Sequence, residues 1–437
     1  MKEAMRQSLT KDIGKIITIL QRNDALTAKD LKDLSNHVIN DVALYKNTDA
    51  ATLAILIYSI YKSILCIEAN KHDEVVRGLQ ILQSNLKLKQ FTKYNSSMKQ
   101  LFTLLKECDS RIKNHIQDVF YAAKIKKGTN LMERGLSIAR AADLMGVSRW
   151  DVMQYGGSNV AVEQHSESWP ASKRIALARK IFSTKGAPYD SLLVDAGPII
   201  TLALSQLLWI LEPLRQKTGM TFYITPAVYS ELVEKPQTIR RFQFEALHVQ
   251  KLLREGTIQL YSKKISKQTT TRLTRLANNS FQIKEGPLEI LQAGELETLA
   301  LAMETNAAML MDERTLRLLI EKPTGMKRLL EGRKRKRVKS NPEILKQFQA
   351  LVGRPSIIRS VELIAVAFEF GIIDSFLPEI SPTKDLNAAK RQLLESVLWN
   401  AKYHGASVID HEIDEIMQAV LIMYHIVLFY PMLPFYC

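Results

Sequence analysis

Cysteine is scarce in this chain, and its scarcity excludes two kinds of architecture. Three cysteines occur in 437 residues, Cys66, Cys108 and Cys437, and no two of them have the short spacing of a metal-binding pair. A disulfide framework and a zinc motif are therefore not expected. The first ten residues also lack the apolar core of a secretory signal peptide. Both absences fit a reducing, cytoplasmic location.

Acidic residues are outnumbered by basic ones. Lys plus Arg total 60 against 45 for Asp plus Glu, which gives a formal net charge of +15. This excess favours contact with phosphate backbones or anionic surfaces without specifying either. At this length the chain exceeds one compact core, so we expect roughly two or three domains.

The N-terminal third is predicted to be helical. In residues 1–120 the side chains of Ile13, Ile16, Ile17 and Leu20 recur at helix spacing. We expect a helical bundle whose Lys-rich surfaces are solvated helix faces, and the pattern assigns no chemistry to it.

Residues 121–158 carry a more specific pattern. Two helical segments flank the tight turn Gly146-Val-Ser148, and Ser148 is suited to cap the second helix. The arrangement resembles the helix-turn-helix of small antitoxins and repressors. That resemblance implies that Ser148, Arg149, Trp150 and Gln154 face DNA or an antitoxin-like partner. The alternative is an ordinary helical hairpin packed against its neighbour.

A polar linker is predicted at 159–188, and the pattern then changes to an alternation of strands and helices over 189–415. Such alternation predicts an α/β fold, because right-handed crossovers place helices on both faces of a parallel sheet. We expect three layers and about five strands. The expected strands are 191–194, 221–226, 257–261, 307–312 and 356–360.

Two segments depart from this regular pattern. Between the fourth and fifth strands an insertion, 320–355, contains the basic run Arg333, Lys334, Arg335, Lys336 and Arg337. It can clamp a nucleic-acid backbone through counterion release, and its alternative is a disordered basic loop.

The C-terminal tail, 416–437, has no Asp, Glu, Lys or Arg. It reaches the length of about 20 apolar residues that a bilayer span needs. However, Pro431 and Pro434 interrupt it, and its preceding flank is acidic. We favour a buried final helix, with a tail anchor and an aberrant terminus left open, and do not expect a membrane partner.

Acidic residues gather at one predicted edge of the sheet. Asp195 and Asp312 end strands, Glu231 lies one turn into a helix that follows a strand, and Glu295 and Glu297 lie in the first turn of another helix. Clustered carboxylates repel one another unless a divalent cation neutralises them. Oxygen ligands without His or Cys favour Mg²⁺ or Mn²⁺. As alternatives, Asp195 caps the helix that follows it, and Glu295 and Glu297 are favourable N-terminal helix charges.

Four motifs in this order resemble a PIN domain of the archaeal and bacterial, toxin-like branch. They are Asp195-Ala-Gly-Pro-Ile-Ile-Thr-Leu202, Pro226-Ala-Val-Tyr-Ser-Glu231, Gly294-Glu-Leu-Glu297 and Met309-Leu-Met-Asp312-Glu313-Arg314. In the second motif Val stands one place early relative to some relatives. In the first, Ala196 and Gly197 replace the Ser, Thr or Asn that often supports the first Asp.

The resemblance implies a metal-dependent ribonuclease. Asp195, Glu231, Glu297 and Asp312 would then be the catalytic metal ligands. Glu295 and Glu313 would be outer or alternative ligands, and Arg314 would contact a phosphate or anchor Asp312.

Two other functions stay open beside an endoribonuclease. One is a non-catalytic helix-turn-helix regulator with a PIN-like half, and the other is a DNA structure-specific nuclease that uses the same metal chemistry. RNA is the expected substrate, and the sequence leaves a homodimer open.

Overall fold

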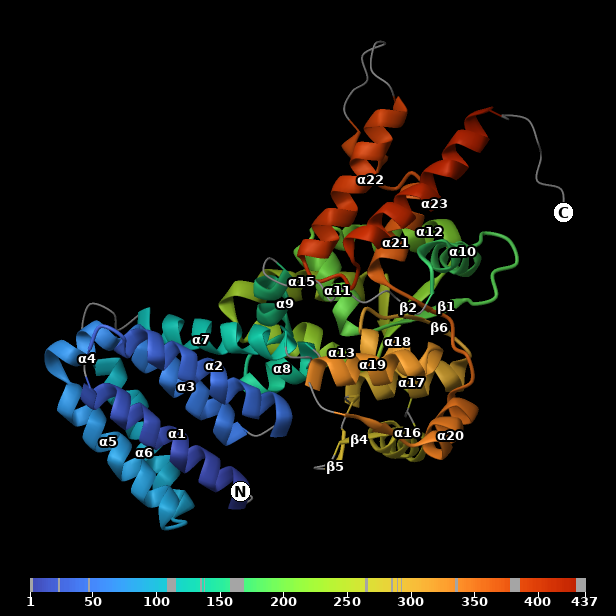
Figure 1. The fold of residues 1–437 in the computed structure, drawn as a ribbon. Coiled ribbons are helices and arrows are strands. Elements are labelled where there is room, and N and C mark those ends of the chain that lie inside the picture. Colours follow the sequence, from blue (N-terminus) through green and yellow to red (C-terminus); the bar gives the residue numbers. More distant parts are fainter. Residues whose placement is uncertain are drawn as a thin grey trace. The chain divides into compact units, whose positions relative to one another are not determined.

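The computed structural model describes residues 3–429, except for 23, 46–47, 108–114, 134–135, 137, 158–168, 264–265, 284–285, 289, 292, 335–336 and 378–385. The chain forms two compact units, Met1–Val152 and Met153–Cys437. Each unit has its own arrangement of elements (Figure 1).

The N-terminal unit is helical throughout its described part, as predicted. Ile13, Ile16 and Leu20 are buried in its core, so the expected helix spacing does mark the packed face. The helices are α1 (Glu3–Arg22), α2 (Thr27–Tyr45), α3 (Thr48–Lys62), α4 (Ile64–Asn70), α5 (His72–Lys87), α6 (Phe91–Glu107), α7 (His115–Glu133) and α8 (Ile138–Met145), with α9 (Arg149–Gly157) at the boundary between the units.

Two short helices and a turn occupy the segment that resembles a helix-turn-helix. Gly146 adopts a left-handed φ of 60° between α8 and α9, and the Ser148 hydroxyl accepts a hydrogen bond of 3.0 Å from the Trp150 amide. Trp150 is 0% exposed. The expectation that Trp150 faces a nucleic acid or a partner is therefore wrong, because its ring is part of the packed interior. The same expectation is wrong for Ser148, which is buried and whose hydroxyl binds the Trp150 amide, whereas Arg149 and Gln154 are partly exposed.

A five-stranded sheet organises the C-terminal unit. Its order is β3-β2-β1-β6-β8 and every pairing is parallel, which confirms the predicted α/β fold. In register, Leu192 of β1 pairs with Phe222 of β2 on one side and with Ala308 of β6 on the other. The strands are β1 (Ser191–Val194), β2 (Thr221–Ile224), β3 (Ile258–Leu260), β6 (Ala308–Leu310) and β8 (Ile357–Ile358).

Helices lie on both sides of this sheet (Figure 1). On one side are α10 (Ala171–Ile181), α12 (Leu211–Thr218), α21 (Ser360–Glu369), α22 (Leu386–Tyr403) and α23 (Asp410–Phe429). On the other are α16 (Lys267–Asn279), α17 (Ala293–Thr305), α19 (Pro323–Lys334) and α20 (Pro342–Val352). The remaining helices are α11 (Ala196–Leu204), η1 (Leu208–Ile210), α13 (Pro226–Tyr229), η2 (Ser230–Glu234), α14 (Lys235–Gln237), η3 (Arg240–Phe242), α15 (Gln243–Arg254), α18 (Arg314–Glu321) and η4 (Asp374–Phe376).

The segment predicted as a linker contains a packed helix. In α10 the side chains of Ile175, Ala178 and Ile181 are buried, and the helix packs against α21 and α23. Arg174 of α10 donates to Glu321 at 2.7 Å. The sequence of 159–188 suggested a linker because most of its residues are polar. The apolar residues of α10 are few and stand among several cations, so their helical spacing is hard to recognise.

The insertion between β6 and β8 is also folded. Its helices α19 and α20 bury Met326 and Phe348 in the core, so the insertion is packed on both sides of the basic run. A second sheet, which the sequence analysis does not predict, has the order β5-β4-β7 and joins β4 (Phe281–Ile283) to β5 (Gly286–Pro287) and β7 (Lys339–Ser340). Arg337 is exposed. The side chains of Arg333, Lys334, Arg335 and Lys336 lie outside the described residues.

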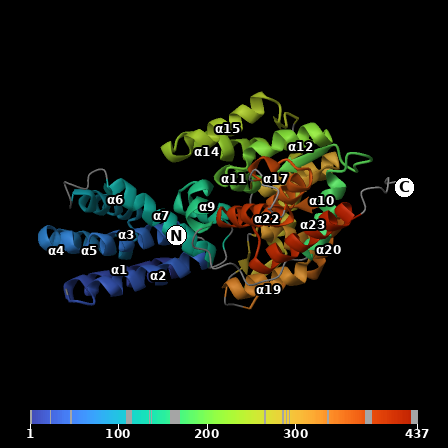
Figure 2. The same cartoon turned by 90° about the horizontal axis from the view of Figure 1, so that it is seen from above.

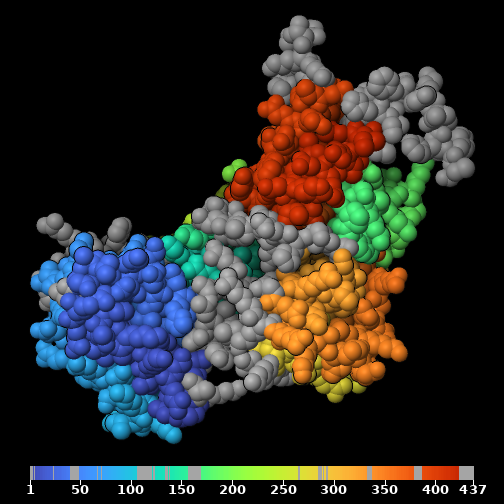
Figure 3. Space-filling view, in the orientation of Figure 1, coloured from blue at the N-terminus to red at the C-terminus, as the bar shows by residue number. Residues whose placement is uncertain are grey.

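The last described element, α23, crosses position 416 without a break, and Ile416 and Val420 are buried. Figure 3 shows α22 and α23 in red on the surface of the C-terminal unit. Within the described residues no single helix is long and apolar enough to cross a membrane, although the bent pair Ala196–Leu204 and Leu208–Thr218 passes by length and composition. Residues 430–437 of the predicted tail lie outside the described part.

Candidate active site

Asp195 stands at the carboxyl end of β1, where a parallel sheet presents its ligand-binding edge. Its backbone amide donates to the Leu310 carbonyl at 3.0 Å, which joins this position to the end of β6. The side chain caps α11, because Oδ2 accepts a hydrogen bond of 3.3 Å from the Gly197 amide. The residue is 1% exposed. The predicted cap is therefore present, and it leaves the second carboxylate oxygen, Oδ1, outside the capping bond.

Asp312 lies two residues beyond β6 and is held on two sides. Ser360, which begins α21 directly after β8, donates its amide to Oδ1 at 2.9 Å and its hydroxyl to Oδ2 at 2.8 Å. Thr201 of α11 donates to Oδ2 at 3.4 Å. These three donors come from elements on either side of β6 and fix the carboxylate, which is 6% exposed.

The charge of Asp312 is opposed by its surroundings. Burial raises the pKa of this carboxyl, against the hydrogen bonds from Ser360 and the attraction of Arg317 and Arg359, which lower it. Because burial is the larger effect, the chain holds Asp312 in a position where proton uptake is easier than in water.

Glu231 and Glu297 both lie where η2, α13 and α17 pack together. Glu231 lies in η2, and its Oε1 would be 3.6 Å from a Cβ added at Gly294, so this carboxylate lies against the first turn of α17. Glu297 of α17 accepts a hydrogen bond from the Ala227 amide at the start of α13, while burial raises the pKa of its carboxyl. A glycine at 294 keeps open the space beside Glu231.

The other predicted site residues have more structural roles. Glu313 caps α18 by accepting from the Thr315 amide at 3.2 Å. Glu295, in the first turn of α17, and Arg314, in the first turn of α18, are both buried. Burial of Arg314 leaves little of it for contact with a phosphate from solvent, and the cations that attract Asp312 are Arg317 and Arg359.

Two buried arginines behind Asp312 were missed by the sequence analysis. Arg317 donates to the Met311 carbonyl at 3.0 Å and to the Ser407 hydroxyl at 3.3 Å. Arg359 donates to the Ser407 carbonyl at 2.8 Å and to Glu412 at 3.0 Å. The loop before α23 is thereby joined to both residues that precede the site, Met311 before Asp312 and Arg359 before Ser360.

The predicted ligands are of the chemical type that binds a hard divalent cation, but they do not lie close enough together to form a metal site. All predicted ligands are carboxylates, the donors that Mg²⁺ and Mn²⁺ prefer. Within the described part of the chain, no group of three or more His, Cys, Asp and Glu side chains lies close enough to hold a metal ion. The structure instead shows Asp195 and Asp312 at adjacent strand ends, and Glu231 and Glu297 at the contact of η2, α13 and α17.

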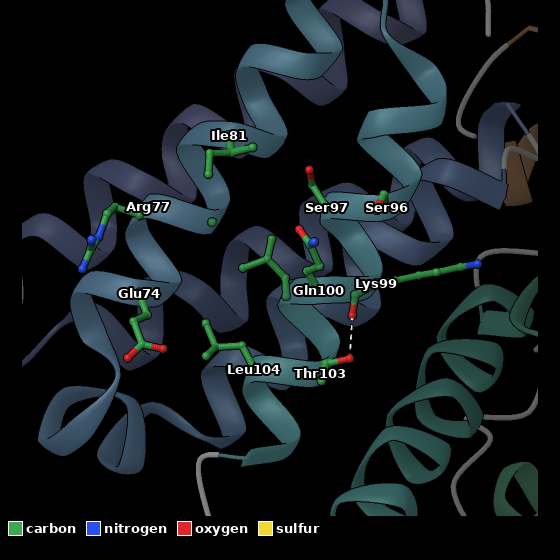
Figure 4. A pocket seen from close by; sticks show the side chains of 11 residues that line it. Glu74, Arg77, Ile81, Ser96, Ser97, Lys99, Gln100, Thr103 and Leu104 are labelled. Carbon is green, nitrogen blue, oxygen red and sulfur yellow. Dashed lines mark hydrogen bonds between the residues drawn. The ribbon is translucent and has the colours of Figure 1, made fainter.

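The N-terminal unit contains a separate surface hollow of about 640 Å³ between α5 and α6 (Figure 4). The apolar side chains Ile81, Leu101 and Leu104 line it together with serine, threonine and glutamine side chains, two cations and the single acid Glu74. This composition assigns it neither catalytic nor metal chemistry.

Comparison with known families agrees with the motifs at the sheet edge. Residues 191–323 match the family model DUF3368, which describes a PIN domain. The match contains Asp195, Glu231, Glu297 and Asp312, and it ends before α20, β8 and Ser360. No curated protein and no solved structure matches the chain.

Proposed function

Residues 191–323 are a PIN domain, and from this premise we propose that the chain is a metal-dependent endoribonuclease. PIN domains are generally nucleases and typically use divalent metals. The observation that carries the proposal is the restraint on Asp312, which Ser360 and Thr201 hold at a strand end next to that of Asp195. A buried carboxylate that hydrogen bonds from two separate elements orient, at the ligand-binding edge of a parallel sheet, is a candidate functional group.

In this proposal Asp195, Glu231, Glu297 and Asp312 hold Mg²⁺ or Mn²⁺. A bound cation of this kind supplies a polarised phosphodiester and a water of lowered pKa. The chain's own contribution is orientation: Ser360 and Thr201 fix Asp312, and the Gly197 amide fixes one oxygen of Asp195. Because no three of the described acids lie close enough to share one ion, their side chains would have to approach one another around the cation.

RNA is proposed as the substrate for two reasons: the chain has more Lys and Arg than Asp and Glu, and its resemblance to PIN domains implies a ribonuclease. Among the predicted nucleic-acid contacts, Arg337 is exposed and available to a phosphate, while Arg314 is buried. The paired helices α8 and α9 remain a proposed contact for DNA or an antitoxin-like protein through Arg149 and Gln154.

The direct test is a cleavage assay on matched single-stranded RNA and DNA oligonucleotides with the full chain. We expect RNA to be cut in Mn²⁺ and to stay intact in EDTA. Cleavage of DNA alone would instead support a structure-specific DNA nuclease. The proposal fails if neither substrate is cut at any Mg²⁺ or Mn²⁺ concentration.

A non-catalytic nucleic-acid-binding regulator is the second candidate, and the spacing of the acids favours it. No three of the described carboxylates are within reach of one ion. Calorimetric titration separates the two candidates: an enzyme site should bind Mn²⁺ in a way that Glu297→Gln and Asp312→Asn each abolish, whereas a regulator should show no such binding.

Metal binding should weaken in acid earlier than for an ordinary carboxylate site. Burial raises the pKa of both Asp312 and Glu297, so protons compete with the cation above the usual carboxylate range of about pH 4. Mn²⁺ affinity measured from about pH 8 to about pH 5 should therefore fall steadily. An affinity that is unchanged down to about pH 5 would show that these two carboxyls do not hold the ion.

A further inference from the structure

One face of α15 exposes apolar side chains that a folded chain normally covers. Phe244 is 77% exposed and Leu247 is 54% exposed. They are three residues apart, so they lie on the same side of the helix. The opposite side of α15 is buried through Ala246, Val249 and Leu252. Core packing therefore explains the apolar residues on that side, but not Phe244 and Leu247.

Cations surround this exposed pair. Arg240 and Arg241 in η3 precede Phe244, and Lys251 and Arg254 follow along α15; all four are exposed. Lys251 lies 3.7 Å from the Glu255 carboxylate, and both side chains are largely exposed, so this pair contributes little. An aromatic ring bordered by cations is the pattern of surfaces on which nucleobases stack while phosphates are neutralised.

The position of α15 connects this face with the candidate active site. The helix packs against η2, which carries Glu231. After α15 only residues 255–257 precede β3, so the helix ends near the amino edge of the sheet. Its N-terminal residues therefore point toward the carboxyl edge, and Figure 2 shows α14 and α15 at an outer edge of the C-terminal unit.

We propose that Arg240, Arg241, Phe244, Leu247 and Lys251, together called the α15 face, bind a single-stranded nucleic acid. One base would stack on the Phe244 ring against Leu247, and the flanking cations would contact phosphates. A duplex hides the faces of its bases, so stacking selects a single strand. The apolar area is limited to two side chains, whereas cations border it at both ends; this charge complementarity favours a polyanion over an apolar protein partner.

The idea that the α15 face positions a substrate rests on the proposed nuclease function. Binding of a nucleic acid to this face can nevertheless be measured without cleavage. The probe is a fluorescein-labelled ten-nucleotide oligouridylate, titrated with the full chain in EDTA and followed by fluorescence anisotropy. Phe244→Ala should weaken binding by roughly 5- to 150-fold, the range for loss of one base–aromatic stack. Phe244→Leu should weaken it nearly as much, and Phe244→Trp should retain it.

The cations are tested by salt dependence. An Arg240→Ala and Arg241→Ala double variant should reduce the slope of log affinity against log salt by about 0.7 for each lost phosphate contact. Phe376→Ala is the matched control, because Phe376 is another largely exposed ring of the same unit, at 62%. It should leave affinity unchanged.

Two results would overturn the inference. Unchanged affinity and salt slope in the Phe244 and arginine variants would remove the α15 face from nucleic-acid binding. Concentration-dependent association of the chain that Phe244→Ala abolishes, with oligonucleotide affinity intact, would assign the face to a second copy instead. Inactivity toward RNA in Mn²⁺ would count only against the proposed function, because the titration in EDTA needs no cleavage.

Discussion

A chain that carries Asp195→Asn should lose metal-stimulated RNA cleavage by at least about 100-fold while its fold remains intact. The change removes the negative charge at the end of β1 and keeps the shape of the side chain. A neutral amide is a weak ligand for Mg²⁺ or Mn²⁺ compared with a carboxylate. The measurement is the initial rate of RNA cleavage in Mn²⁺ for the variant against the original chain.

The capping role of Asp195 makes this variant a clean test. Asn caps a helix about as well as Asp, so the bond from the Gly197 amide should survive and the melting temperature should hardly change. The comparison variant Asp195→Ala should also lose cleavage, and it should lose about 1 kcal/mol of stability with the cap. Undiminished cleavage by Asp195→Asn would rule out Asp195 as a metal ligand.

The parallel sheet was predictable because each buried strand is a short apolar run that ends at a turn or a carboxylate. Asp195 and Asp312 mark two of these ends, and both fall on one edge as expected. The small antiparallel sheet was not predictable, because its strands have two or three residues and no alternation is visible over that length.

The acidic residues of the candidate site were predictable from the sequence, but the residues that hold them in place were not. Ser360 was expected as the last residue of the fifth strand but begins α21, and nothing in the pattern pairs it with Asp312. Arg317 and Arg359 gave no signal at all, because arginine is normally exposed and their partners lie elsewhere in the chain. Trp150 was misassigned because an aromatic residue at the start of a helix is compatible both with a binding surface and with a core.

The buried ion pairs of Arg359 connect the site to residues beyond the family match. Its guanidinium lies 2.6 Å from Glu362 and 3.0 Å from Glu412, and all three side chains are almost completely buried. Burial opposes the charge of Glu362, but the attraction and hydrogen bonds of Arg359 hold the pKa of this carboxyl below its usual range. In the original chain this pair therefore contributes stability that is present near neutral pH and is lost as the pH falls.

Arg359→Met should lower the free energy of unfolding by about 3–5 kcal/mol, because it removes the cation that both buried carboxylates contact. Burial would then raise the pKa of Glu362, so the variant should recover part of the loss as the pH falls, the opposite slope to the original chain. Urea denaturation at about pH 7.5 and about pH 5 measures both effects.

Arg354→Met, at an exposed arginine of the same unit, is the matched control and should change stability little. Adding Glu362→Gln should restore part of the stability at neutral pH, since it removes one uncompensated charge. A loss below about 1 kcal/mol would mean that solvent reaches these groups.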